Sequence, residues 1–225
     1  MSRETYKNSH QSHENKKENR HIFGEVQSCV IEALRRATAE RHRQVETQVR
    51  LGAEFDIGHY RCVLQCFEAF LAPWEACIAA SLPPRLQHWF SARQRLALLR
   101  LDLAALSTPP LGLPDKAFEL ALPSLAAAFG SLYVMEGSAL GGQVIARQLA
   151  RPLARQHGIG AENGGAYFGG AGDGTAAKWR EFRQFLEQEV GSSPACRAHA
   201  CTAAVQTFDA LIMTLQRSIH EPAAT

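Results

Sequence analysis

Residues 130–145 have the sequence GSLYVMEGSALGGQVI, and no other segment says more about the architecture of this chain. They lie within an apolar run over 124–149, whose hydrophobic residues predict one long helix. Gly137, Gly141 and Gly142 interrupt that helical pattern. Each glycine costs about 0.8–1.0 kcal/mol relative to alanine in a helix interior, so something should compensate for three of them.

The spacing of these glycines suggests what compensates for them. Gly137 and Gly141 are four residues apart and therefore share one face of the predicted helix. A face without side chains lets another body touch the backbone. That body is either a neighbouring helix or a flat ligand, and the spacing alone leaves both alternatives open.

The rest of the chain also has helical periodicity. Apolar residues at spacings of three and four predict further helices over 26–49, 59–80, 86–106 (as one or two helices), 176–190 and 197–217. Pro73 should kink the second of these helices or mark a new start. Proline and glycine predict loops over 108–114 and 158–174. Since no segment alternates like a strand over a useful length, the predicted fold is all-α, with seven or eight helices around one core.

Composition narrows the class of protein. The chain has 225 residues, 46% hydrophobic and 20% charged, with a net charge of +2. This favours a single domain over 25–220 after a disordered polar tail over 1–24, and gives no basic field for nucleic acid. No apolar run reaches the roughly 18 residues of a membrane span, so we expect no membrane partner. Without an export signal, we expect a cytoplasmic protein with reduced cysteines, of which Cys62 and Cys66 share one helical face as core residues.

One histidine lies on an apolar helical face. His42 is three residues before Val45 on the stripe of the first predicted helix, and Glu46 follows one turn later. A carboxylate in reach of one ring nitrogen fixes the tautomer and leaves the other nitrogen for a metal. The alternative is a core histidine with a satisfied hydrogen bond, and the residues alone leave both readings open.

Two segments together resemble a known family. Residues 34–46, LRRATAERHRQVE, resemble the proximal helix of the haem oxygenases, Leu-x-x-Ala-Thr-x-x-x-His-x-x-x-Glu. Residues 132–145, LYVMEGSALGGQVI, resemble the distal helix, in a form closer to the bacterial branch that includes enzymes accompanying bacteriophytochromes. Segments at 167–170, 179–182 and 207–211 are also similar, so that the resemblance spans 30–215.

The resemblance implies an enzyme that opens haem to biliverdin and releases carbon monoxide and ferrous iron. Haem b would be both cofactor and substrate. His42 would be the axial ligand of the iron, with Glu46 holding its other ring nitrogen. Gly137, Gly141 and Gly142 would lie over the opposite face of the haem, with their backbone against the ring and the oxygen.

The resemblance also implies roles at the ring edge and outside the site. Arg35 and Arg180 would bind the haem propionates, and Phe208 would line the ring edge. Ser138 stands where many members have an acid that organises distal water. Since the sequence has no flavin or nicotinamide fingerprint, we expect an external electron donor, a ferredoxin or a flavoprotein reductase. A bacteriophytochrome is a candidate acceptor of the biliverdin.

Three other classes of protein fit parts of the pattern. One is a haem carrier or sensor on the same fold, without turnover. Another is a helical di-iron oxidase using Glu46, Glu136 and histidines, although no Glu-x-x-His pair lies in a predicted helix core. The last is a purely structural helical protein, in which the glycines serve packing alone.

Overall fold

The computed structural model describes residues 29–50, 56–111, 118–160, 163–170, 172, 174–191 and 193–220, without the side chains at 148–153, 155–157 and 218–220. The predicted tail over 1–24 and part of the predicted loop, residues 112–114, lie outside them. The described residues form eight helices and no strand. The all-α prediction is therefore confirmed.

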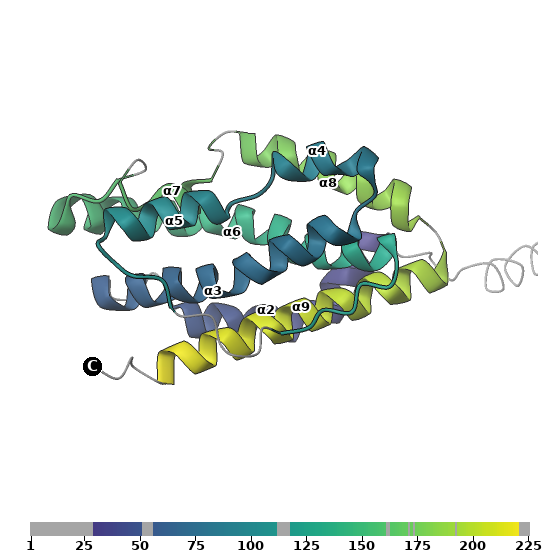
Figure 1. Ribbon diagram of the computed structural model, residues 1–225, viewed down its shortest axis with the longest axis horizontal. Coiled ribbons are helices and arrows are strands. Elements are labelled where there is room, and N and C mark those ends of the chain that lie inside the picture. The colour runs from purple at the N-terminus through teal and green to yellow at the C-terminus, as the bar shows by residue number, and fades with distance from the viewer. Residues whose placement is uncertain are drawn as a thin grey trace, which may run out of the picture.

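The helices pack around one core, with α6 between the other elements (Figure 1). They are α2 (Val30–Val49), α3 (Ile57–Ser81), α4 (Pro84–Ser91), α5 (Leu96–Ala105), α6 (Leu125–His157), α7 (Ala166–Gly169), α8 (Gly174–Val190) and α9 (Pro194–His220). Helix α6 packs against α9 and α8, and α9 packs against α2. This arrangement brings α2, near the start of the sequence, beside the last helix (Figure 1).

Local sequence signals explain most helix ends. The carboxylate of Asp56 accepts hydrogen bonds from the backbone of Gly58 (2.9 Å) and His59 (3.1 Å), which caps the start of α3. Pro84 begins α4, where a missing N–H costs nothing. Gly158 has a φ of 63° and follows α6 directly, as is common after a helix C-terminus.

Two boundaries differ from the sequence prediction. Helix α6 does not end near Leu149 but runs through Pro152 to His157. The next residue is Gly158, the first glycine after Leu149, which adopts a left-handed conformation easily. Pro73 does not start a new helix, because α3 continues through it to Ser81.

The core explains two features of the apolar helices. A Cβ placed on Gly130 would lie 2.0 Å from the carbonyl oxygen of Ala200, so Gly130 allows the close approach of α6 and α9 at this point. Helix α3 is long and apolar enough to cross a membrane, but 61% of its most apolar segment is buried inside the molecule. That degree of burial is typical of the core helix of a globular domain.

Candidate functional site

A cavity of about 570 Å³ lies between the second half of α2 and the middle of α6. We call this cavity the slot. It is lined by His42, Val45, Glu46, Val49 and Arg50 of α2 and its C-cap, by Gly137, Ser138, Gly141, Gly142, Val144 and Ile145 of α6, and by Phe67, Arg95, Tyr167 and Phe168. Its size is within the range of roughly 300–1,000 Å³ found for small-molecule sites. The two sequence motifs therefore face one shared cavity.

The slot decides between the two explanations of the glycines. A Cβ on Gly137 or Gly141 would meet no atom of the described residues within 4 Å beyond its own helix turn and neighbours. Helix packing therefore does not require either glycine. Gly142 differs, because a Cβ there would come within 3.3 Å of the carbonyl oxygen of Phe168. Gly142 thus allows close packing against α7, while Gly137 and Gly141 leave bare main chain on the wall of the slot.

His42 and Glu46 lie together on the opposite wall. The His42 Nδ1 atom is 3.5 Å from the Glu46 Oε1 atom, and both side chains are more than half exposed. The His42 ring also meets the ring of Phe208 edge-on, with centroids 6.0 Å apart. Because Nδ1 is the nitrogen nearer the carboxylate, Nε2 is the nitrogen that remains for a metal.

Arg95 is a residue of the slot that the sequence prediction missed. Its Nη2 atom donates hydrogen bonds to the carbonyl oxygen of Met135 (2.7 Å) and to the Ser138 hydroxyl (3.0 Å). The Ser138 hydroxyl in turn donates to the Met135 carbonyl at 2.8 Å. Arg95 also lines a second cavity, of about 300 Å³, together with Arg93 and Glu136. It lies in the short connection between α4 and α5, where no periodic pattern marks it.

Glu136 is the acidic neighbour of Gly137 in sequence, but it lies at the second cavity rather than the slot. Burial raises the pKa of its carboxyl group, while Arg93 and Arg95 oppose that rise. The Arg93 Nε atom lies 3.5 Å from Glu136 Oε1. The described residues contain no group of three or more histidine, cysteine or acidic side chains able to hold a metal. They therefore offer no support for the di-iron alternative.

A buried carboxylate holds the third wall of the slot. The two oxygens of Asp102 accept hydrogen bonds from the backbone N–H of Ala166 (2.9 Å) and Tyr167 (2.7 Å) at the start of α7. Burial raises the pKa of Asp102, and these backbone donors lower it. Asp102 therefore anchors Tyr167 and Phe168 against the slot.

The remaining predicted residues lie outside the lining of the slot. Arg35 is exposed on α2 and is close enough to Tyr133 to lower the pKa of its hydroxyl group, which burial raises. Arg180 is exposed on α8 and does not line the slot. Phe208 is not among the residues that line the slot, and its ring contacts the ring of His42. The roles given to these three residues stay predictions.

Together these features describe an all-α protein with a slot for a flat, largely apolar ligand, imidazole on one wall and main chain on the other. No family model matches the chain. It is 37% identical over 153 residues to the heme oxygenase of Xanthomonas campestris pv. campestris (strain 8004). The aligned residues make up 68% of this chain and 86% of that relative. The chain belongs to the haem oxygenase family.

A solved structure supports the same fold. The NO- and CO-bound heme oxygenase from Neisseria meningitidis superposes with a TM-score of 0.66 over 88% of this chain and 95% of its own, at 21% identity. The predicted family and its enzyme class, an oxidoreductase, are confirmed. Neither comparison favours a carrier or sensor without turnover.

Proposed function

We propose that the chain binds haem b in the slot and opens the ring to biliverdin, with release of carbon monoxide and ferrous iron. The observation that carries this proposal is that Gly137 and Gly141 present bare main chain to a cavity whose other wall bears His42. Bound haem would supply both the iron that activates oxygen and the ring that is cleaved. The apolar lining from Val45, Val49 and other side chains suits a porphyrin plane.

On the α2 wall, His42 is the residue that would hold the haem iron. Glu46 lies nearest to Nδ1, so it favours the tautomer in which Nε2 carries the free lone pair. An imidazole ligand would donate less electron density to the iron than a thiolate, and would therefore favour O–O cleavage less.

On the α6 wall, main chain and one fixed charge face the ring. The Ser138 hydroxyl already donates its proton to Met135, so it does not present a strong acid to the slot. The Arg95 guanidinium that donates to Ser138 places a cation beside this wall. Arg95 can therefore stabilise developing negative charge without acting as a proton donor.

The propionates need cationic partners near the edge of the ring. Arg35 lies seven residues before His42 and hence on the same face of α2, two turns away. We assign it, together with Arg180, to the haem carboxylates, because guanidinium groups bind carboxylates in a bidentate manner. Arg50 lines the slot directly and is a further cation available for this role.

The sequence also bears on two protein partners, the electron donor and the acceptor of biliverdin. Without a nucleotide-binding fingerprint, electrons come from a ferredoxin or a flavoprotein reductase. The resemblance of the α6 motif to the bacterial branch makes a bacteriophytochrome the proposed acceptor of biliverdin. We propose the cytoplasm as the place of the reaction.

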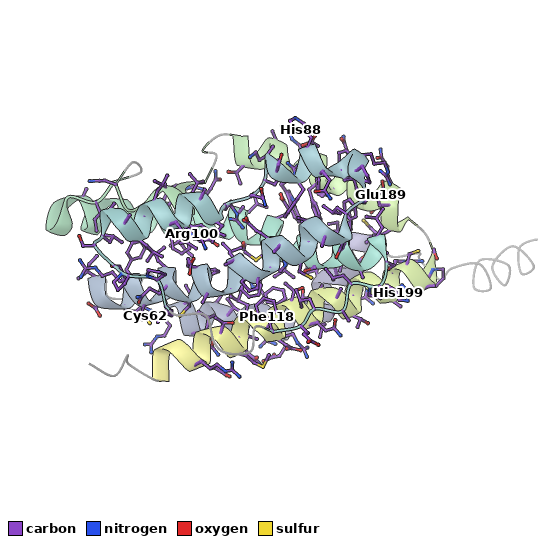
Figure 2. All side chains as sticks on the ribbon, viewed as in Figure 1. Cys62, His88, Arg100, Phe118, Glu189 and His199 are labelled. Atoms are coloured by element: carbon purple, nitrogen blue, oxygen red, sulfur yellow. The ribbon has the colours of Figure 1, made fainter. Side chains whose placement is uncertain are left out.

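Haemin titration tests the proposed ligand. Wild-type protein should give the Soret band of a histidine-ligated haem, and His42→Ala should lose it. His88→Ala is the matched control, because His88 is exposed on the outer side of α4 (Figure 2) and does not line the slot. An unchanged spectrum in His42→Ala would refute the assignment of the ligand.

Turnover is tested on the same complexes. With reduced ferredoxin or ascorbate and oxygen, the Soret band of the wild-type complex should give way to biliverdin absorbance. Haem that stays intact under these conditions would contradict the proposed reaction and favour a carrier.

A further inference from the structure

A two-point link joins α2 to α9 beside the slot. The Arg41 Nε atom donates to Asp209 Oδ1 at 2.6 Å, and Arg41 Nη2 donates to Asp209 Oδ2 at 3.2 Å. The two helices lie side by side over much of their length (Figure 1). A bidentate arginine–carboxylate pair fixes orientation as well as distance, because two parallel hydrogen bonds resist rotation.

A second contact between α2 and α9 lies directly beside this ion pair. His42 follows Arg41, and its ring meets the ring of Phe208, which precedes Asp209. The two contacts are therefore consecutive along α2 and run in the opposite direction along α9. Together they fix which residues of the two helices lie opposite each other, and hence the rotation of α2 about its axis.

His42 has few other contacts that hold its direction. The Glu46 carboxylate is 3.5 Å away, longer than a normal hydrogen bond, and belongs to the same helix. The contact between Arg43 and Glu40 is also internal to α2 and cannot fix the helix against its neighbours. Where His42 enters the slot therefore depends on how α2 itself is held.

We propose that Arg41 and Asp209 form a positioning pair, which sets the rotation of α2 and thereby the direction of the His42 imidazole in the slot. This inference rests on the proposed role of His42 as the iron ligand. Neither residue of the pair lines the slot, so neither touches the substrate. Their effect is transmitted through the helix backbone.

The test compares Arg41→Ala, Asp209→Ala and the double variant with a change in another bidentate arginine–carboxylate pair, which lies elsewhere in the molecule. Arg85 and Glu189 form a bidentate pair between α4 and α8, at 2.6 and 2.9 Å, and neither residue lines the slot. Figure 2 labels Glu189 of this pair. Since both pairs are partly exposed, Arg85→Ala should cost a similar amount of stability.

The readouts are haemin affinity and the iron–histidine stretching frequency of the ferrous complex. Arg41→Ala and Asp209→Ala should shift the frequency and weaken haemin binding by about two- to fivefold, whereas Arg85→Ala should change neither. Arg41→Lys keeps the charge but loses the bidentate hydrogen bonding, so the iron–histidine frequency of this variant should lie between those of wild type and Arg41→Ala. The double variant should match the single variants, because a shared interaction is lost only once.

Wild-type frequency in both alanine variants, or additive effects in the double variant, would overturn the positioning role. Those results leave the proposed function standing as long as His42→Ala loses the histidine-ligated spectrum. Retention of that spectrum in His42→Ala would instead show that His42 is not the iron ligand, on which this inference rests. Thermal melts of the haem-free variants show whether folding is kept, and Arg41→Lys preserves the test if an alanine variant does not fold.

Discussion

Replacing Gly137 and Gly141 by alanine should stabilise the haem-free protein. Neither added methyl group meets a described atom within 4 Å beyond the local turn, so each substitution keeps the full gain in helix propensity. That gain is about 0.8–1.0 kcal/mol per site, or about 1.6–2.0 kcal/mol for the double variant. For a domain of this size, the melting temperature should rise by roughly 3–8 °C.

The same substitution at Gly130 should have the opposite sign. Its Cβ would lie 2.0 Å from the backbone carbonyl oxygen of Ala200, and a backbone atom cannot turn away as a side chain can. Helix α9 must move instead. Overpacking of this kind costs about 1–3 kcal/mol or more, which exceeds the gain in propensity of about 1 kcal/mol.

Thermal and urea unfolding of the haem-free proteins measure these changes, followed by haemin titration. The double variant should melt higher but bind haemin more weakly, because the methyl groups occupy the face of the slot. Gly130→Ala should melt lower. A lower melting temperature for the Gly137/Gly141 double variant would refute the reasoning, since it would show that these glycines serve packing.

Two further predictions concern the walls of the slot and the thiols of α3. Asp102→Asn replaces one acceptor of the α7 backbone N–H groups by a donor. The free energy of unfolding should therefore fall by about 1–3 kcal/mol, and haemin binding should weaken. An unchanged melting temperature would contradict the anchoring role. The hydrogen bond with Cys66 lowers the pKa of the Cys62 thiol to about 6 from its usual 9.0. Loss of this hydrogen bond raises the pKa and so lowers the fraction of thiolate at pH 7; Cys66→Ala should therefore slow alkylation of Cys62. Iodoacetamide labelling with peptide mass spectrometry measures that rate, and an equal rate in both proteins would exclude the thiol pair as its cause.

How much of the structure can be predicted from the sequence depends on how far apart in sequence the interacting residues lie. Helices follow from periodicity within one segment, so the all-α fold was predictable. The use of each glycine was not, because it depends on which distant residue lies opposite: Ala200 faces Gly130 and Phe168 faces Gly142. Among the described residues, none comes within 4 Å of a Cβ on Gly137, and only the folded chain shows that.

The site divides in the same way. His42 and Glu46 are neighbours on one helix, so their pairing was visible as a spacing. Arg95, at the N-cap of α5, reaches Ser138 of α6 across more than forty residues of sequence, and no local pattern predicts that contact. The helix end predicted near Leu149 was wrong, because the apolar run ends there while the helix continues through Pro152 to His157.

Arg95 has one more consequence, since it lines both the slot and the second cavity. One side chain thus borders both cavities, and its hydrogen bonds to Met135 and Ser138 hold it against the turn of α6 that bears Gly137. A shorter side chain at position 95 should extend the slot toward the second cavity. Position 95 is therefore the place to enlarge the slot for a porphyrin with a bulkier substituent.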